Sequence, residues 1–213
     1  MPTAVIDRRA ALKARHRAAI LHAAQELIVE RSGPRFSVDE LAERADVARR
    51  TVFNHFASLD EVILTLAGDV LAVLVDEFTA AVAAMPVGDG TRASMFDELA
   101  ATLRSADLVA AIVALNQLVG ADDDGQARRQ ALTQEAFARV GGSVAHEVER
   151  RNPAADPLDV ELLVSSLING LVVIASRWVT DGGAAAQPEA RAAWERLLTR
   201  LLDSVRNGYL HTP

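Results

Sequence analysis

The stretch SVDELAERADVARRTVFNHF, from Ser37 to Phe56, decides the fold because it predicts two short helices joined by a tight turn. Glu40 follows Ser37 by three positions, which is a capping-box signature in which each side chain bonds a free backbone N–H at the helix start. The three residues centred on Asp46 have room only for a turn, and Asp tolerates a left-handed backbone better than most residues. A second helix is then predicted from about 48 to 55.

The second helix has one apolar side and one polar side. Val52 and Phe56, four residues apart, share the inward side. The outward side carries Arg49, Arg50, Thr51, Asn54 and His55. A short helix with cationic and amide groups outside, braced by a preceding helix, suits the major groove of DNA. The pattern predicts a helix-turn-helix. The alternative is an ordinary helical hairpin whose arginines are merely solvated.

The segments on either side of this stretch also carry signals for the start and end of helices. An apolar helical stripe precedes it and stops at Ser32-Gly33-Pro34, a helix stop signal. Ser58 and Glu61 form a second capping-box signature that opens a long helix directly after the predicted recognition helix.

This order of elements, from Arg17 to Ile63, resembles the N-terminal domain of the TetR (tetracycline-repressor) family of bacterial regulators. The sequence departs from the family pattern at four positions. Asp46 stands where the family usually has Gly, Ala48 where it has a small hydroxylated residue, and Phe53 where it has Tyr. Leu59 replaces a common Lys, so the phosphate contact that the Lys would make is missing.

The pattern assigns roles to the polar residues of the first part of the chain. We expect Arg49, Arg50, Thr51 and Asn54 to contact bases, since Arg suits guanine and Asn suits adenine. His55 and the N-terminal basic residues should contact phosphate. The predicted DNA-binding set is Ser37, Arg49, Arg50, Thr51, Asn54, His55, Arg9 and Lys13.

The charge distribution agrees with this assignment. The chain of 213 residues has a net charge of −7, divided into +2 for residues 1–60 and −9 for residues 61–213. Binding to the DNA backbone requires a local basic surface rather than a basic protein. Cysteine is absent, which excludes disulfides and thiolate chemistry and is compatible with a reducing cytoplasm. Nothing at the N-terminus looks like a signal peptide.

The rest of the chain predicts further helices and an all-α fold. Apolar stripes and Pro/Gly breaks place these helices at about 60–84, 91–104, 107–119, 126–151, 158–180 and 188–207. The acidic residues at 120–125 are expected in a solvated turn rather than in a cation site. Domains are predicted at 1–59, a three-helix DNA-binding domain, and 60–213, a helical ligand-binding and dimerisation domain.

The segment 158–180 is the most apolar of the chain, yet the uncharged interval between Glu161 and Arg177 is too short for a membrane span. We therefore expect a buried or interface helix. With 188–207 it carries more apolar surface than one antiparallel partner covers, which predicts a homodimer, as the resemblance also implies. The predicted interface is Leu167, Leu171, Trp178, Trp194, Leu198 and Leu201, and core packing within one subunit is the alternative for the two tryptophans.

The helices between 91 and 151 are expected to enclose a cavity for a hydrophobic or weakly polar small molecule. Its predicted lining is Met95, Phe96, Leu99, Leu103, Ile112, Leu115 and Phe137, with Asn116, Gln117 or Asn169 as polar anchors. The alternative is that these apolar residues simply fill a core.

These features predict a homodimeric, cytoplasmic transcriptional regulator, a repressor that binds a near-palindromic DNA operator and is released by a small hydrophobic effector. No cofactor or metal is predicted. Two other classes of function stay open: an all-helical protein-interaction module that does not bind DNA, and a small helical enzyme. The enzyme is disfavoured because the chain lacks a Gly-rich phosphate loop, a metal-spaced His pair and a G-x-S-x-G motif.

Overall fold

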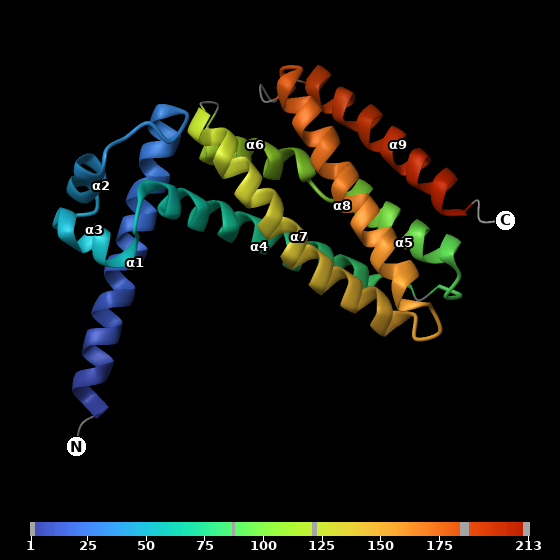
Figure 1. Ribbon diagram of the computed structural model, residues 1–213, viewed down its shortest axis with the longest axis horizontal. Coiled ribbons are helices and arrows are strands. Elements are labelled where there is room, and N and C mark those ends of the chain that lie inside the picture. Colours follow the sequence, from blue (N-terminus) through green and yellow to red (C-terminus); the bar gives the residue numbers. More distant parts are fainter. Residues whose placement is uncertain (1–2, 87, 121–122, 184–187, 211–213) are drawn as a thin grey trace. The chain divides into compact units, whose positions relative to one another are not determined.

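The computed structural model describes residues 3–86, 88–120, 123–183 and 188–210, and every regular element in these ranges is a helix (Figure 1). This confirms the predicted all-α fold. The helices are α1 (Thr3–Arg31), α2 (Val38–Arg44), α3 (Arg49–His55), α4 (Leu59–Ala84), α5 (Arg92–Ser105), α6 (Leu108–Val119), α7 (Asp123–Arg151), α8 (Pro157–Thr180) and α9 (Pro188–Leu210).

One boundary differs from the prediction. The turn expected over 120–125 is shorter, because α7 begins at Asp123. Residue 122, another acidic residue of the segment 120–125, lies outside the described residues.

Packing divides the chain into two units. The first, here the N-terminal unit, comprises residues 1–69 and 117–131, and the second, the C-terminal unit, comprises 70–116 and 132–213. Three helices, α4, α6 and α7, therefore contribute residues to both units.

The N-terminal unit is built by packing α1 against α2 and α3, and α2 against α3. Its core consists of apolar side chains spaced at helical intervals: Ile20, Ala23, Ala24, Leu27, Ile28, Leu41, Ala42, Val52, Phe56, Val62 and Ile63. Asp46 in the turn between α2 and α3 has φ of +52°, the left-handed backbone that the sequence predicts for it. At the end of α1, the N–H of Gly33 donates to the carbonyl of Ile28 (2.9 Å), which closes that helix.

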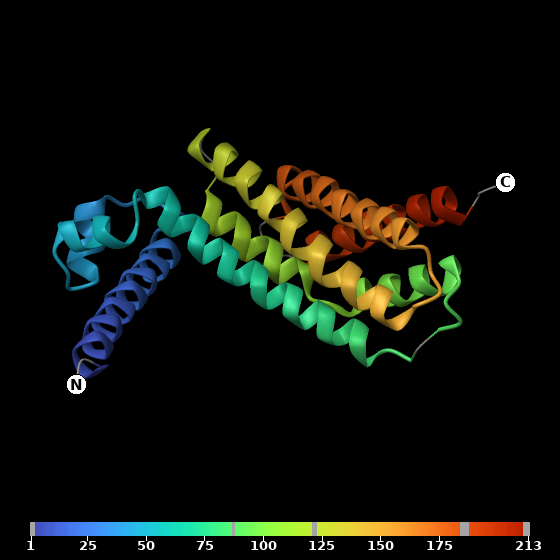
Figure 2. The same cartoon turned by 60° about the horizontal axis from the view of Figure 1, so that its bottom comes forward.

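In the C-terminal unit, α8 packs along α9, and α5 also contacts α9 (Figures 1 and 2). Gly170 lets the two long helices approach closely, since a Cβ at this position would lie 2.0 Å from Leu201 Cδ1. Trp178 and Trp194 meet edge to face, with ring centroids 5.9 Å apart, and Trp178 Nε1 donates to the carbonyl of Ala190 (2.7 Å). Both tryptophans therefore hold α8 and α9 together within one chain.

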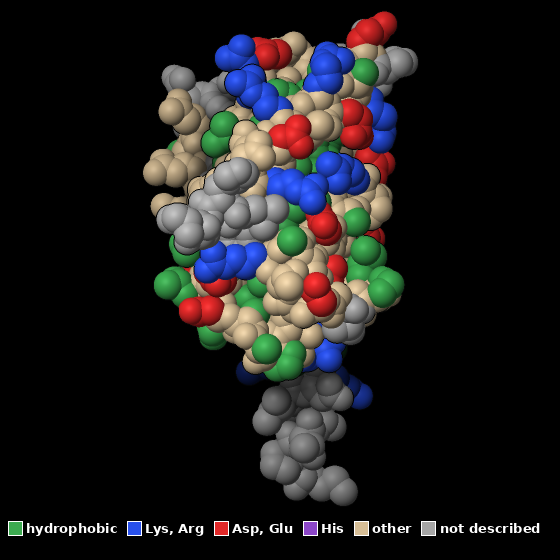
Figure 3. All heavy atoms as spheres, turned by 90° about the vertical axis from the view of Figure 1, so that its right-hand side faces the viewer, with side chains coloured by type: hydrophobic (Ala, Val, Ile, Leu, Met, Phe, Trp, Pro, Cys, Tyr) green, Lys and Arg blue, Asp and Glu red, His purple; other side chains and the backbone are tan. Residues whose placement is uncertain are grey.

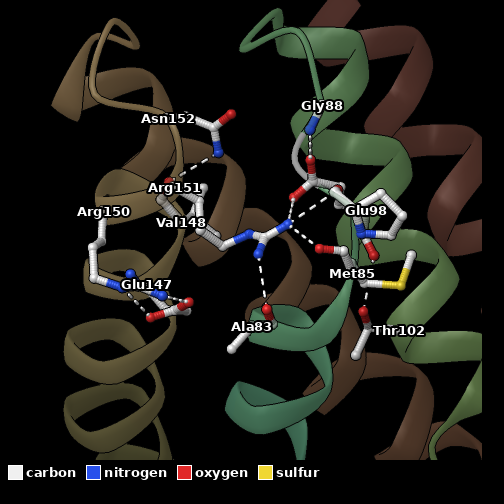
Figure 4. A network of polar contacts seen from close by, with 11 residues as sticks. Ala83, Met85, Gly88, Glu98, Thr102, Glu147, Val148, Arg150, Arg151 and Asn152 are labelled. Atoms are coloured by element: carbon white, nitrogen blue, oxygen red, sulfur yellow. Dashed lines mark hydrogen bonds and ion pairs between the residues drawn. The ribbon is translucent and has the colours of Figure 1, made fainter.

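A buried polar network fixes the end of α4 to α7 and α5 (Figure 4). The Arg151 side chain is only 5% exposed. It donates to three carbonyls at the end of α4, those of Ala83 (3.0 Å), Met85 (2.7 Å) and Pro86 (3.1 Å). A guanidinium is favourable at a helix C-terminus because the free carbonyls there carry partial negative charge. Glu98 supplies the counter-charge at 3.5 Å and accepts the N–H of Gly88 (3.0 Å).

The apolar helix α8 is long and apolar enough to cross a membrane by length and composition alone. Its Val160, Leu163, Val164 and Leu167 lie in the core shared with α5 and α9. Other apolar side chains of α8, those of Leu158, Leu162 and Val173, are exposed. On the face shown in Figure 3, basic and acidic side chains are interspersed with scattered hydrophobic ones. That face presents no concentrated basic surface.

Candidate nucleic-acid interface and ligand cavity

The start of α2 forms the predicted capping box. The Ser37 hydroxyl accepts the N–H of Glu40 (3.2 Å), and the Glu40 carboxylate accepts the N–H of Ser37 (2.7 Å). Arg31 at the end of α1 donates to the same carboxylate (2.6 Å). This bond from Arg31, followed by those from Ser37, lowers the pKa of Glu40 to about 2. Because the Ser37 hydroxyl is part of the cap, its first role is to close the start of α2, while the bond from Arg31 to Glu40 links α2 to α1.

The helix α3 has no side-chain cap, since Ala48 precedes it. It is held instead by Val52 and Phe56, which are both 2% exposed. Arg49, Arg50, Phe53 and Asn54 project into solvent, in two rows of residues four apart. One side of α3 is therefore polar and exposed, while the other side is apolar and buried. A helix that binds in the major groove requires this arrangement.

Arg49 has a fixed position on this face. Its Nη1 donates to both carboxylate oxygens of Asp39 on α2 (2.9 and 2.7 Å). Its guanidinium carbon also lies 5.6 Å from the centre of the Phe53 ring. Phe53 itself is 45% exposed, unusual for a side chain of its size. Sequence reasoning missed the role of Asp39 because no helical spacing links residues on two different helices.

Arg50 and Asn54 form the other row, and both are exposed. Neither side chain forms a hydrogen bond or an ion pair with another described residue. Thr51 is half-buried and lies on the row that leads to His55. Of the four residues predicted to contact bases, Arg50 and Asn54 are thus the freest to meet a ligand.

His55 turns back toward α1. Its ring lies edge to face with His16, with centroids 6.2 Å apart, and its Nδ1 is buried without a hydrogen-bond partner among the described residues. Burial lowers the pKa of His55, and the positive charges of Lys13, His16 and Arg17 lower it further. The neutral ring is consequently favoured in the free protein.

The two basic residues predicted from the N-terminus lie on the exposed side of α1. Lys13 is near His55, since its charge acts on that ring. Arg9 is one helical turn before Lys13 on the same side. The structure therefore brings Lys13 near His55 at the side of α3, and Arg9 lies one turn closer to the start of α1.

A buried arginine in the N-terminal unit joins the start of α4 to the end of α6. The Arg128 side chain on α7 is 9% exposed, and its Nη2 lies 2.6 Å from Oδ1 of Asp60. Its Nη1 donates to the carbonyl of Val119, the last residue of α6 (3.1 Å). Asp60 belongs to the first turn of α4, directly after the recognition helix. No sequence pattern indicates this contact between residues 68 positions apart.

The C-terminal unit contains a cavity of about 210 Å³. Among the residues predicted to bind a ligand, Leu99, Leu103, Ile112 and Leu115 line it. Met95 and Phe96 are buried in the surrounding core instead. None of the three predicted polar anchors lines the cavity: Asn116 is half-buried, and Gln117 and Asn169 are exposed. The side chain of Phe137 lies outside the described residues. The predicted polar anchors are thus not part of the described wall.

The six residues predicted for a dimer interface lie on α8 and α9. Leu167, Leu171 and Trp194 line the cavity, while Trp178, Leu198 and Leu201 are at most 9% exposed in the α8–α9 contact. For the two tryptophans, this placement agrees with the alternative of core packing within one subunit. The exposed apolar side chains of α8 are different ones: Leu158, Leu162 and Val173.

Metal chemistry has no support in the described part of the chain, where no three His, Cys, Asp or Glu side chains cluster closely enough to hold an ion. The arrangement offers an exposed cationic helix and an apolar cavity, which suit binding.

Comparisons with known proteins agree with this geometry. Residues 20–66 match the family model described as "Bacterial regulatory proteins, tetR family". A candidate TetR-family transcriptional regulator from Mesorhizobium loti has a solved structure that superposes with a TM-score of 0.59 at 19% identity, covering 92% of this chain and 96% of its own. A candidate tetR-family regulator from a Shewanella species gives 0.49 at 22% identity, covering 86% and 95%. No curated protein matches the chain.

The matched segment contains the whole of α2 and α3, together with the parts of α1 and α4 that pack around them. The segment 20–66 of the chain is therefore similar to the helix-turn-helix region of the tetR family of bacterial regulatory proteins, and the all-helical fold is shared with a solved structure.

Proposed function

We propose that the protein is a cytoplasmic repressor that binds a near-palindromic operator as a homodimer and leaves it when a small hydrophobic effector binds. The observation that carries the proposal is the exposed face of α3, where Arg50 and Asn54 project without a partner among the described residues. Residues 1–59 would serve as the DNA-binding domain, and residues 60–213 as the ligand-binding and dimerisation domain.

The geometry of α3 supports distinct roles for its polar residues. Arg50 and Asn54 are free to bond a guanine and an adenine in the major groove. Arg49 would contact DNA from the position in which Asp39 and Phe53 hold it. Thr51 would contact a base from the edge of the exposed face of α3. Arg9, Lys13 and His55 would contact phosphate, which fixes the protein on the duplex without selecting sequence.

Selection of bound duplexes from a random library, followed by titration at several salt concentrations, tests this proposal. Arg50→Ala should lose roughly 1–3 kcal/mol of discrimination at one base pair and relax the selected sequence. Lys13→Ala should weaken all duplexes about equally and reduce the salt slope by about 1. Arg200→Ala, on the exposed side of α9, is the matched control and should change neither. If the wild type selects no sequence, the protein-interaction module becomes the better proposal.

The proposed dimer rests on the exposed side of α8. Leu158, Leu162 and Val173 recur there at intervals that keep them on one side of the helix. Apolar side chains in a row favour association with a second copy, because the same surface on each copy is then self-complementary. A two-fold dimer whose recognition helices lie roughly 34–36 Å apart would meet two half-sites one turn apart.

Sedimentation equilibrium separates the dimer from a monomer of 22.8 kDa. Leu162→Glu should give a folded monomer, since this side chain is already 53% exposed and its replacement leaves the core intact. Val73→Glu, on α4 and 58% exposed, is the matched control and should remain a dimer. A wild-type protein that sediments as a monomer at micromolar concentration would exclude the dimer and leave DNA binding to be explained otherwise.

The proposed response to an effector uses the Arg128 contact. Three turns of α6 that line the cavity, at Leu108, Ile112 and Leu115, precede the Val119 carbonyl that Arg128 binds. A ligand that shifts α6 would thus displace Arg128 and, through Asp60, the start of α4. The recognition helices would then lose the spacing that two half-sites require. By linkage, an effector that weakens DNA binding is itself bound less tightly by the DNA-bound protein.

A further inference from the structure

We infer that the cavity of the C-terminal unit binds an uncharged hydrocarbon of about ten carbon atoms that carries no hydroxyl, amide or carboxylate group. The inference rests on the proposed function in that it names the chemical class of the effector. It is more restrictive than the sequence alone allows, because the polar anchors expected there are absent from the described wall.

The composition of the wall is the first argument. All seventeen described residues that line the cavity are apolar, and they come from six helices, α4 to α9. The indole N–H of Trp194 is the one polar side-chain atom among them. Most of these residues lie within helices, where backbone groups bond along the axis. At the start of α6, where an N–H would be free, Leu108 donates to the carbonyl of Ala106 (2.9 Å).

Such a wall selects against polar ligands. A hydroxyl group transferred from water to a site without a partner loses its hydrogen bonds to water and gains none, which should weaken binding at least about tenfold. A carboxylate would lose far more, because an isolated charge in an apolar site is strongly disfavoured. The amide side chains that the sequence predicts as polar anchors cannot replace these hydrogen bonds, since Asn169 is exposed and Asn116 lies outside the wall.

The size of the cavity sets the size of the ligand. An apolar cavity of about 150 Å³ in another protein stays dry and binds benzene. The cavity of this protein has a volume of about 210 Å³, and the difference from that benzene-binding cavity leaves room for roughly one further fused ring. The aromatic rings of Phe78 and Trp194 in the wall can pack against the edges and faces of a ring ligand. A fused or substituted ring hydrocarbon therefore fits better than a single ring.

The test is equilibrium dialysis of the full chain, without DNA, against naphthalene, 1-naphthol and 1-naphthoate. These three probes share one ring system and differ in the polar group. We expect one naphthalene bound per chain, 1-naphthol bound at least about tenfold more weakly, and no detectable 1-naphthoate. Failure to bind naphthalene, or binding of 1-naphthoate as tight as that of naphthalene, would overturn the inference.

Cavity variants locate the bound probe. Leu103→Trp fills the cavity and should abolish naphthalene binding. Leu115→Phe adds less volume, so it should weaken naphthalene binding while disturbing the fold less. Val73→Trp, on the exposed side of α4, is the matched control and should bind normally. Undiminished binding by a folded Leu115→Phe protein would place the probe elsewhere and overturn the inference.

A separate titration of operator DNA with and without naphthalene distinguishes this inference from the proposed function. If naphthalene binds as expected but leaves DNA affinity unchanged, the ligand class stands and the role of the cavity in DNA release falls. If DNA is never bound, the repressor proposal fails while the dialysis result is unaffected.

Discussion

The recognition helix and the cavity are built in opposite ways. The exposed face of α3 comes from seven consecutive residues, is polar, and meets solvent. The cavity wall comes from six helices between residues 71 and 194, is apolar, and is formed by packing between those helices. A side chain on α3 therefore changes binding with little effect on folding, whereas a change in the wall alters packing and binding together.

Arginines at the surface and in the interior also have different roles. In the N-terminal unit, Arg31, Arg44 and Arg49 pair with carboxylates near the surface, at 2.6–2.9 Å. Exposed pairs of this kind contribute little to stability because water screens them. In the C-terminal unit, Arg151 is buried and bonds three carbonyls (Figure 4). The comparison predicts a large loss of stability at Arg151 and small losses at the surface pairs.

The largest effect is expected from Arg151→Ala. Removing this guanidinium leaves the buried Glu98 without its counter-charge and three carbonyls at the end of α4 without their donor, which should cost about 3–5 kcal/mol of unfolding free energy. Urea unfolding followed by circular dichroism measures it. The control is Arg177→Ala, in an exposed pair with Asp181, which should cost at most about 1 kcal/mol. Equal losses in the two variants would remove the distinction between the arginines.

A smaller effect is expected from Arg128, which combines features of both kinds. Its own side chain is buried, but Asp60 is 53% exposed. A double-mutant cycle of Arg128→Met and Asp60→Asn in urea should give a coupling energy of about 0.5–3 kcal/mol. The same Arg128→Met protein should also show a smaller change in operator affinity on addition of naphthalene. Additive free energies would show that the contact does not join the two helices energetically.

The cap of α2 should contribute about 1 kcal/mol. Ser37→Ala removes the acceptor for the N–H of Glu40, and this N–H then depends on water. Ser204→Ala, on the exposed side of α9, provides the control and should be close to neutral. If thermal unfolding shows a loss of stability in Ser37→Ala but not in Ser204→Ala, the cap contributes to the stability of the N-terminal unit. Equal stability of the two variants would contradict this prediction.

The smallest effect is the pH dependence contributed by His55. Because burial lowers the folded pKa of His55, its contribution to stability is fully present above its unfolded value of about 6.5. As pH falls below that value, the unfolded chain takes up a proton that the folded chain does not, and stability decreases. Between about pH 7.5 and about pH 5.5, the urea midpoint should fall more in the wild type than in His55→Gln. His22→Gln, on the exposed side of α1, should keep the wild-type dependence.

Much of the N-terminal unit follows from sequence because its determinants are local. The capping box spans four residues, and the turn depends on one residue that accepts a left-handed backbone, Asp46. The outward residues of α3 follow from helical spacing around Val52. The ion pair of Arg49 with Asp39 does not, because it joins side chains of two helices whose relative angle is set by packing against α1.

The sequence by itself determined the helices, the helix-turn-helix and the outward position of Arg50 and Asn54, because caps, breaks and helical periodicity act within a few residues. Only the tertiary structure decided which apolar residues form a core and which line a cavity. Met95 and Leu99, one turn apart on α5, fall on different sides of that distinction. Likewise, Trp178 and Trp194 hold α8 to α9 within the chain. Burial and cavities arise where helices distant in sequence meet, and no local pattern specifies how closely they meet.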